Sequence, residues 1–92
     1  PVVLMGDFNS NPDSDPIKIF KNNLKDALEI SSTKLKGPTG TFNGFDKMHP
    51  LDNRIDYIFV KKMKVFSYRH IDDRLGNNRH ISDHLPVMIS VQ

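Results

Sequence analysis

Three short polar motifs in this sequence border apolar segments that are typical of buried strands. Their carboxylate, amide and imidazole groups are of the kinds that bind metal ions and move protons in proteins. The three motifs lie far apart in the sequence, so only the fold can bring their side chains together in one site. The motifs are Gly6-Asp7-Phe8-Asn9, Arg54-Ile55-Asp56-Tyr57 and Ser82-Asp83-His84.

Each motif taken alone also has a structural interpretation. Asp7 and Asn9 directly after a strand are typical of an Asx turn. Asp56 lies within an apolar strand, where its charge needs a cation or a hydrogen-bond donor. Arg54, two residues away on the same face, provides that cation in a plain surface pair. Residues 82–84 are equally typical of a polar turn.

The three motifs taken together favour a chemical site. A histidine needs a carboxylate to hold its tautomer and support its protonated form, and Asp56 can be that carboxylate for His84. Asp83 is then free for a metal ion, provided that the backbone turns at residues 83–84. Asp7 and Asn9 are two residues apart and share a face, so both can reach one centre. Oxygen ligands with one imidazole and no thiolate suit Mg²⁺ or Mn²⁺.

This set of groups matches the hydrolysis of phosphate esters. A metal ion neutralises the charge that builds on the phosphoryl oxygens. A carboxylate orients or deprotonates the attacking water, and an imidazolium and an amide stabilise the transition state. The sequence therefore predicts a metal-dependent phosphoesterase.

The first part of the chain predicts one strand and one helix. An apolar run over residues 2–5 predicts a buried strand, followed by a loop over residues 6–14. Asp15 as N-cap and Pro16 at the first helical position predict a helix start. Apolar side chains at spacings of three and four predict a helix over residues 16–24, and the same spacing allows an extension to residue 28.

The second part of the chain predicts strands. Residues 41–42 are expected to form a short strand, and residues 54–60 and 65–71 an antiparallel hairpin. Residues 72–85 are a charged loop, and residues 86–91 form the closing strand. Because strands do not alternate regularly with helices, the sequence predicts an α+β fold with a mainly antiparallel sheet and one or two helices.

Composition excludes several kinds of site. The chain of 92 residues contains no cysteine, so disulfides and thiolate metal sites are absent. No run approaches the roughly 18 apolar residues of a membrane helix, so we expect no membrane span. The formal net charge of +2 is compatible with an anionic partner. A candidate phosphate-contacting patch, or else a solvated loop, is formed by Arg69, His70, Arg74, Arg79 and His80.

The three motifs in this order resemble the last three motifs of the endonuclease/exonuclease/phosphatase superfamily. That superfamily includes DNase I, apurinic endonucleases, neutral sphingomyelinases and inositol-polyphosphate 5-phosphatases. Order and spacing agree over residues 2–91, and residues 37–45 are also similar to uncharacterised bacterial members. The resemblance implies the C-terminal half of a DNase I-like four-layered α/β sandwich, in which two mainly antiparallel sheets pack face to face with helices outside.

The resemblance also implies catalytic roles. Asp7 would position or activate the water, and Asn9 would bind a phosphoryl oxygen or a metal ion. Asp56 would orient His84, and His84 would contact the phosphate in the transition state.

Three further residues receive roles from the same resemblance. Asp83 would join a metal site with Asp7 and Asn9. Thr41 would lie on a loop near the substrate, and Arg54 would be structural.

The family domain is longer than this chain, so residues 1–92 are interpreted as its C-terminal part. The N-terminal part normally carries an Asn, a metal-binding Glu in a Gln-Glu motif and a central His or Tyr. The only Gln and Glu here, Gln92 and Glu29, are not adjacent. We therefore expect the isolated chain to be inactive or nearly so. Half a sandwich also leaves an apolar face open, so we expect self-association or a missing half supplied by another chain.

The sequence leaves the substrate class open. The phosphate ester can belong to a nucleic acid, a phospholipid headgroup or a sugar phosphate. A second function class is a non-catalytic module that binds nucleic acid or phosphate on the same scaffold.

Overall fold

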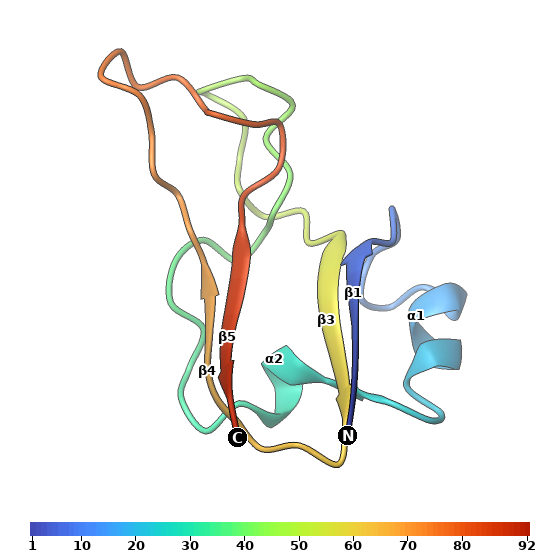
Figure 1. Cartoon of the computed structure of the whole chain (residues 1–92). Coiled ribbons are helices and arrows are strands. Elements are labelled where there is room, and N and C mark those ends of the chain that lie inside the picture. Colours follow the sequence, from blue (N-terminus) through green and yellow to red (C-terminus); the bar gives the residue numbers. More distant parts are fainter.

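A three-stranded antiparallel sheet forms the first part of the fold, in a computed structural model that describes all 92 residues. Its strands lie in the order β1 (Val2–Asp7), β3 (Asp56–Lys61), β2 (Lys25–Asp26). Helix α1 (Asp15–Phe20) lies beside this sheet, away from the rest of the chain (Figure 1).

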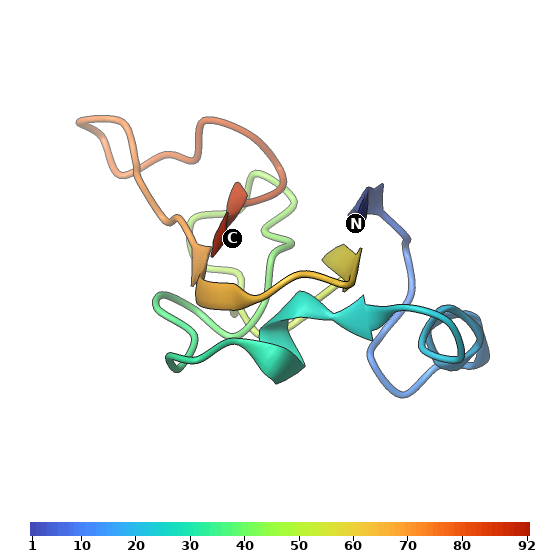
Figure 2. The same ribbon diagram turned by 60° about the horizontal axis from the view of Figure 1, so that its bottom comes forward.

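A second antiparallel sheet pairs β4 (Val65–His70) with β5 (Val87–Val91). Helix α2 (Ala27–Ile30) contacts both β3 and β4, and Figure 2 shows it on one side of the two sheets. The predicted α+β fold with a mainly antiparallel sheet and one or two helices is confirmed, and the helices are two and short.

Strand β3 is the central strand because both of its edges and both of its faces are covered. β1 and β2 pair with its two edges. Tyr57 and Phe59 pack with Ile17 of α1 on one face. On the other face Ile58 and Val60 pack in a second cluster, together with Ala27, Val65 and Tyr68. The two hydrophobic clusters therefore meet through this one strand.

The predicted hairpin between residues 54–60 and 65–71 is wrong. β3 and β4 belong to different sheets, and β4 pairs with β5. The edges of β3 are already occupied, so Val65 and Tyr68 of β4 pack against its apolar face instead. The almost continuous apolar run over residues 57–60 is typical of a strand covered on both faces.

The first helix is shorter than the prediction of residues 16–24. It begins after Ser14 as N-cap, one residue earlier than predicted, and ends at Phe20. Asn22 and Asn23 follow in a turn, which Asn favours over a helix interior. Residues 25–26 then join the sheet, and the Asp26 carboxylate accepts a hydrogen bond from Leu28 N at 3.1 Å to cap α2.

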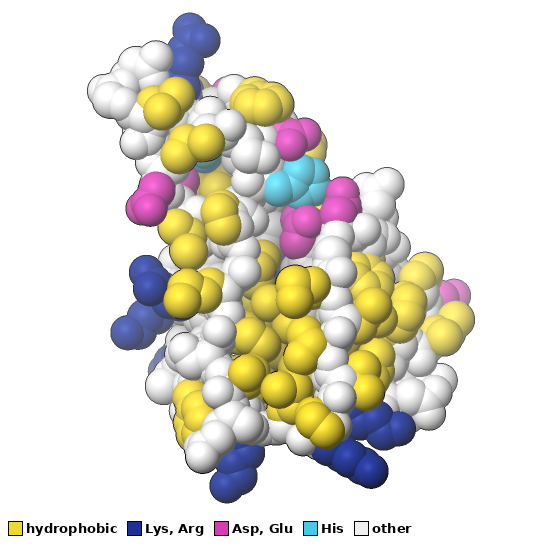
Figure 3. Space-filling model, viewed as in Figure 1, with side chains coloured by type: hydrophobic (Ala, Val, Ile, Leu, Met, Phe, Trp, Pro, Cys, Tyr) yellow, Lys and Arg dark blue, Asp and Glu magenta, His cyan; other side chains and the backbone are white.

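One face of the molecule is strongly apolar. Hydrophobic side chains gather there over β5, β3 and β1 (Figure 3). Met5, on β1, is 64% exposed. Together with Ile58, Leu85 and Val87 it lines an open groove of about 200 Å³ between the two sheets. No helix of the chain has the length and apolar character needed to cross a membrane.

Candidate active site

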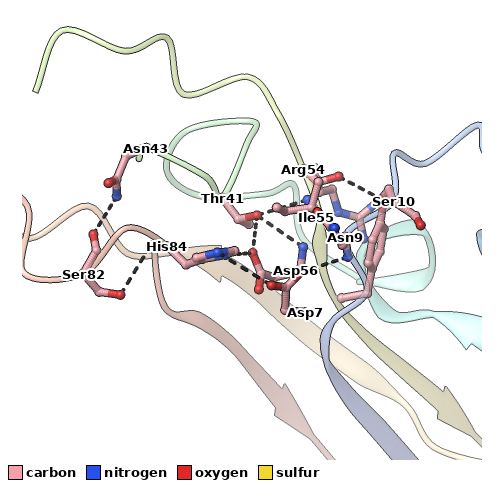
Figure 4. Close-up of polar contacts among 11 residues, drawn as sticks. Asp7, Asn9, Ser10, Thr41, Asn43, Arg54, Ile55, Asp56, Ser82 and His84 are labelled. Atoms are coloured by element: carbon pink, nitrogen blue, oxygen red, sulfur yellow. Dashed lines mark hydrogen bonds and ion pairs between the residues drawn. The ribbon is translucent and has the colours of Figure 1, made fainter. Parts of the chain in front are cut away.

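Asp7 and Asp56 are direct partners at the end of the β1–β3 pair. Like charges opposite each other on paired strands are destabilising, so this pair needs a nearby cation. His84 lies there: its Nδ1 donates to Asp56 Oδ2 at 2.7 Å, and its Nε2 is 3.7 Å from Asp7 Oδ2 (Figure 4). The three residues offer ligand atoms that all lie within 4.8 Å of one another.

Thr41 fixes the Asp56 carboxylate. Its hydroxyl donates to Asp56 Oδ2 at 2.6 Å. The Thr41 Oγ1 atom itself accepts hydrogen bonds from the backbone N–H groups of Ile55 and Asp56, at 3.1 and 3.3 Å. Thr41 is fully buried. Thr41 therefore contacts the carboxylate that holds His84, and its predicted contact with substrate stays a prediction.

The surroundings of His84 favour its protonated form. The hydrogen bond to Asp56 is the main cause that raises the pKa of the imidazole, and the negative charges of Asp56, Asp7 and Asp83 add to it. Partial burial acts in the opposite direction. The raised pKa increases the share of His84 side chains that carry a positive charge between the two facing carboxylates.

Asn43 anchors the loop that carries His84. Its side-chain amide donates to Ser82 O at 2.9 Å, and its backbone N–H donates to Asp83 O at 2.8 Å. Next to it, Phe42 and His84 form an antiparallel bridge. This buried amide was missed by sequence reasoning, and the only signal was its position beside the expected strand at residues 41–42.

The loop after β1 is both an Asx turn and part of the site. Asp7 Oδ1 accepts a hydrogen bond from Asn9 N at 2.8 Å, while Oδ2 faces His84. Asn9 adopts a positive φ of 48°, which Asn tolerates well. Tyr57, a second residue that sequence reasoning missed, donates its hydroxyl to Ser10 O at 2.7 Å and ties this loop to β3. The turn interpretation and the chemical one are therefore compatible.

Asp83 and Asn9 are less closely placed than Asp7, Asp56 and His84. Asp83 does not belong to the compact group of ligand atoms, although its charge reaches His84. Its backbone carbonyl accepts hydrogen bonds from Asn43 and Gly44. Asn9 is exposed on the loop after β1. The metal-binding roles of these two residues stay predictions.

Asp7, Asp56 and His84 provide the right types of ligand for a hard divalent ion, but too few of them. Two carboxylates and one imidazole have suitable chemistry, whereas Mg²⁺ prefers six ligands in octahedral geometry. Asp56 Oδ2 already accepts two hydrogen bonds, from Thr41 and His84. Asp7 is the most exposed of the three and is the side chain with most freedom to bind an ion. This chain therefore offers only part of a coordination shell.

The structural interpretation in which Arg54 and Asp56 form a surface ion pair is wrong. Arg54 donates to Asp26 at 2.6 Å, and the two side chains are only 7% and 2% exposed. The guanidinium lies over the ring of Tyr57 at 4.5 Å and near that of Tyr68 at 5.7 Å. Arg54 is therefore a core residue, and Asp56 is left to His84.

The candidate basic patch of the charged loop does not form. His70 and His80 are buried, and Arg74 is held by the Asp72 carboxylate at 3.0 and 3.2 Å. His70 Nδ1 lies 2.7 Å from Pro38 O in the interior. Arg69 and Arg79 are exposed, but two cations alone do not make the predicted patch.

Solved structures of bacterial proteins are similar to this chain in fold and, more distantly, in sequence. A conserved protein of unknown function from Enterococcus faecalis is 30% identical with a TM-score of 0.89, and the match covers 98% of this chain and 35% of that one. A mannosyl-6-phosphatase from Bacteroides thetaiotaomicron is 30% identical with a TM-score of 0.84, over 98% and 37% of the two chains. An endonuclease/exonuclease/phosphatase family protein from the same organism is 31% identical with a TM-score of 0.86, and the match covers 97% of this chain and 36% of that one.

The chain spans about a third of the length of these structures. Among curated proteins none matches it significantly. Residues 1–84 match the profile of the Endonuclease/Exonuclease/phosphatase family, whose members include hydrolases of phosphate esters. With that match over most of its length, the chain belongs to the endonuclease/exonuclease/phosphatase family.

Proposed function

We propose that the protein carrying this chain hydrolyses phosphate esters with the help of Mg²⁺ or Mn²⁺. The observation that carries the proposal is the placement of His84, whose Nδ1 is hydrogen-bonded to Asp56 at 2.7 Å while its Nε2 faces a second carboxylate, Asp7, on the neighbouring strand. A carboxylate that holds an imidazolium beside another carboxylate can support both proton transfer and charge stabilisation. Family membership supports phosphoesterase chemistry at a general level.

Each residue contributes a defined step in this proposal. Asp7 accepts a proton from the attacking water or orients it, because one of its oxygens faces the site and the other is fixed by the turn. His84 donates a hydrogen bond from Nε2 to a phosphoryl oxygen as negative charge builds there. Asp56, itself held by Thr41, fixes the ring through Nδ1 and stabilises the imidazolium form, in which Nε2 also carries a hydrogen to donate.

A bound divalent ion would supply Lewis-acid stabilisation of the phosphoryl oxygens. Asp7 is its best-placed ligand in the chain, and Asp83 and Asn9 are the further ligands that we propose. Their oxygen atoms are the type that Mg²⁺ and Mn²⁺ prefer. The remaining ligands would come from other parts of the protein or from water.

The substrate is proposed only as a class. The similar Bacteroides thetaiotaomicron protein is a mannosyl-6-phosphatase, which favours a sugar phosphate among the three candidate classes. Nucleic acids and phospholipid headgroups are the other two classes to be tested. Asn9 and His84 are the residues proposed to contact the phosphate, with Thr41 behind them.

Kinetics of the full-length protein test the proposal. With Mg²⁺ and a panel of the three substrate classes, wild type should turn over at least one. Asp56→Asn should lower kcat by about 10²–10⁴-fold, the usual size of acid–base contributions. Asp13→Asn, an exposed carboxylate on the loop after β1, is the matched control and should leave kcat unchanged. Phosphate binding by wild type without any turnover would instead establish the non-catalytic module.

The 92-residue chain alone is proposed to be inactive or nearly so. It offers too few ligands for a complete metal site, and its open apolar face between the sheets favours association with itself or with the rest of the domain. Sedimentation should show oligomers, and assays with Mg²⁺ should show no turnover above background. A monomeric chain with hydrolysis that His84→Ala abolishes would contradict this.

A further inference from the structure

Thr41 and Phe42 link the two segments that carry Asp56 and His84. Their backbone N–H groups both donate to Asn53 O, at 3.0 and 3.2 Å, shortly before β3 begins. On the other side, Phe42 forms an antiparallel bridge with His84, and Thr41 O accepts a hydrogen bond at 2.6 Å from the backbone N–H of the next residue. Because the Thr41 hydroxyl already holds Asp56, the neighbouring residue Phe42 is the one placed opposite His84.

The ring of Phe42 packs against the imidazole of His84. The two ring centroids are 5.4 Å apart, and the ring planes meet at 74° in an edge-to-face arrangement. Residues directly opposite each other in an antiparallel pair bring their side chains together on one side, so the backbone bridge accounts for this contact. The distance lies within the range typical of aromatic pairs.

The hydrogen bond to Asp56 fixes only one atom of the imidazole. Nδ1 is held at 2.7 Å, whereas Nε2 is 3.7 Å from Asp7 Oδ2 and makes no hydrogen bond there. The χ2 torsion of a histidine has a broad energy profile, so the ring can still pivot about its one fixed atom. A second contact on the ring removes that freedom, and Phe42 provides one.

The ring of Phe42 has two further neighbours that hold it. His49 packs edge-to-face against it, with centroids 5.7 Å apart and planes at 86°. Gly44 leaves open the space beside the ring, because a Cβ atom at that position would lie only 3.3 and 3.4 Å from Phe42 Cζ and Cε2. A ring that is itself held in place can restrain the imidazole next to it.

We propose that Phe42 is the positioning residue that sets the orientation of the His84 ring and thereby the direction of Nε2. The proposal rests on the proposed function, in which Nε2 donates to a phosphoryl oxygen as negative charge builds there. Asp56 fixes the position of Nδ1, and Phe42 fixes the plane of the ring. Phe42 acts through His84 and supplies no group to the reaction.

Steady-state kinetics of the full-length protein test this role with Phe42→Leu, which keeps an apolar side chain and removes the ring. We expect kcat to fall about tenfold, because small misplacements of a catalytic group slow a reaction strongly. KM should stay within about twofold, since no contact with substrate is lost. Each variant is measured at its own pH optimum, so that a change in the protonation of His84 does not enter the comparison.

Phe66→Leu is the matched control for this variant. It makes the same substitution on β4, at a side chain that is 40% exposed, and it should change neither kcat nor KM. An equal loss of kcat in both variants would overturn the role of Phe42. A rise in KM with unchanged kcat in Phe42→Leu would make Phe42 a substrate contact, which would also overturn the proposal.

Gly44→Ala displaces the ring of Phe42 without removing it. The added methyl group meets the ring at 3.3 Å, and the positive φ of 61° adds backbone strain at this position. We expect kcat to fall several-fold with KM unchanged. Gly76→Ala adds a methyl group where no atom lies within 4 Å, and as the matched control it should leave kcat unchanged. Unchanged kcat in Gly44→Ala as well would count against the proposal.

NMR of the full-length protein measures the orientation of His84 without any turnover. In wild type, nuclear Overhauser effects should connect the ring protons of Phe42 with those of His84, and His84 should give one sharp set of ring signals. In Phe42→Leu these signals should broaden or split as the imidazole samples several orientations, whereas Phe66→Leu should leave them unchanged. One sharp set of signals in Phe42→Leu would overturn the proposal.

Failure of the positioning role and failure of the proposed function give different results. If wild type hydrolyses phosphate esters and Phe42→Leu has the same kcat, the positioning role alone is refuted. If wild type hydrolyses no phosphate ester, the proposed function fails, and the NMR comparison still decides whether Phe42 orients His84. If Phe42→Leu does not fold, Gly44→Ala, which retains the ring, decides the question by the same kinetic and NMR measurements.

Discussion

Two charged networks start within two residues of each other on the chain and differ in how completely they are closed. Arg54 and Asp26 meet at 2.6 Å in the interior, with side chains 7% and 2% exposed. Asp56 and His84 meet at 2.7 Å at the strand end, where His84 is 25% exposed. His84 Nε2 and Asp7 Oδ2 are 3.7 Å apart, too far for a hydrogen bond, and Asp7 is 49% exposed.

The difference separates stability from chemistry. The Arg54–Asp26 pair joins strand β2 to the segment that precedes β3, and the guanidinium lies beside the rings of Tyr57 and Tyr68. The Asp56–His84 pair is fixed on its inner side by Thr41 and open on its outer side. A sealed pair exposes almost none of its polar atoms to a ligand, whereas the open pair presents His84 Nε2 and a carboxylate oxygen of Asp7 to solvent. We expect substitutions in the two networks to affect different measurements.

The largest expected effect on folding follows from breaking the sealed pair. Arg54→Met removes the cation and leaves Asp26 buried without its partner, which typically costs about 3–5 kcal/mol. Urea unfolding of the full-length protein should show this loss. Lys21→Met, which breaks the exposed pair with Glu29 at 2.9 Å, is the matched control and should cost about 0–1 kcal/mol. A comparable loss in both variants would mean that burial does not distinguish the two pairs.

Thr41→Val tests the inner side of the open network. The change keeps the shape of the side chain and removes the hydroxyl that serves Asp56 Oδ2 and two backbone N–H groups. Unsatisfied buried groups of this kind cost about 1–3 kcal/mol in stability. We also expect kcat to fall about tenfold, because Asp56 loses one of its restraints.

Thr39→Val is the matched control for this variant. The Thr39 hydroxyl makes a single long contact with Leu51 O at 3.4 Å and is exposed. Its loss should stay within about 0.5 kcal/mol, as for most surface changes, and kcat should not change. If Thr41→Val left kcat unchanged as well, Thr41 would be a purely structural residue.

Two histidines give opposite pH dependences. Hydrogen bonding to Asp56 raises the pKa of His84 in the folded chain, so its stabilising contribution is complete below the unfolded value near 6.5. That contribution is lost as the pH rises through the folded pKa. Burial lowers the pKa of His70, so the unfolded state takes up its proton first, and the stability tied to His70 is lost as the pH falls through about 6.5.

NMR titration of the imidazole protons measures both effects. His84 should titrate above His70, and Asp56→Asn should lower the pKa of His84 because it removes the main cause of the shift. The pKa of His70 should respond little, since its largest influence is burial. Titration of His84 at its ordinary value in wild type would contradict the hydrogen bond to Asp56.

The sequence predicted the strand ends better than the partners of the strands. Apolar runs located β1, β4 and β5 to within two residues, because strand periodicity is local. The sequence did not reveal that β3 and β4 lie in different sheets, because β1 and β2, from earlier in the chain, occupy both edges of β3. The apolar character of β3 on both faces was a signal that the hairpin interpretation overlooked.

Some contacts in and near the site could also be predicted from the sequence, and others could not. Residue types and motif order were enough to propose Asp56 as the carboxylate that holds His84, a pair that the structure brings to 2.7 Å. The partner of Arg54 was not accessible, because Asp26 lies 28 residues earlier in a two-residue strand. Asn43 was also missed, because its function is to bond backbone atoms of another loop, which no side-chain pattern records.

The smallest expected effect comes from Tyr57→Phe, which tests how firmly the Asp7 loop must be held. The Tyr57 hydroxyl shares its one hydrogen between Ser10 O at 2.7 Å and Arg54 O at 3.0 Å. Burial raises the pKa of the phenol to about 12, so it stays a donor. Losing it should cost about 0.5–1.5 kcal/mol in unfolding free energy. Because only the loop restraint is lost, kcat should fall by about two- to fivefold, far less than for Asp56→Asn.

Tyr68→Phe is the matched control, because it removes a buried hydroxyl on β4 that makes no contact with the Asp7 loop. Its kcat should equal that of wild type. A Tyr57→Phe variant with wild-type kcat but lower stability would show that the turn formed by Asp7 and Asn9 positions the carboxylate by itself. A loss of kcat as large as that of Asp56→Asn would instead extend the catalytic network through β3 into the core, and the separation between a sealed and an open network would no longer hold.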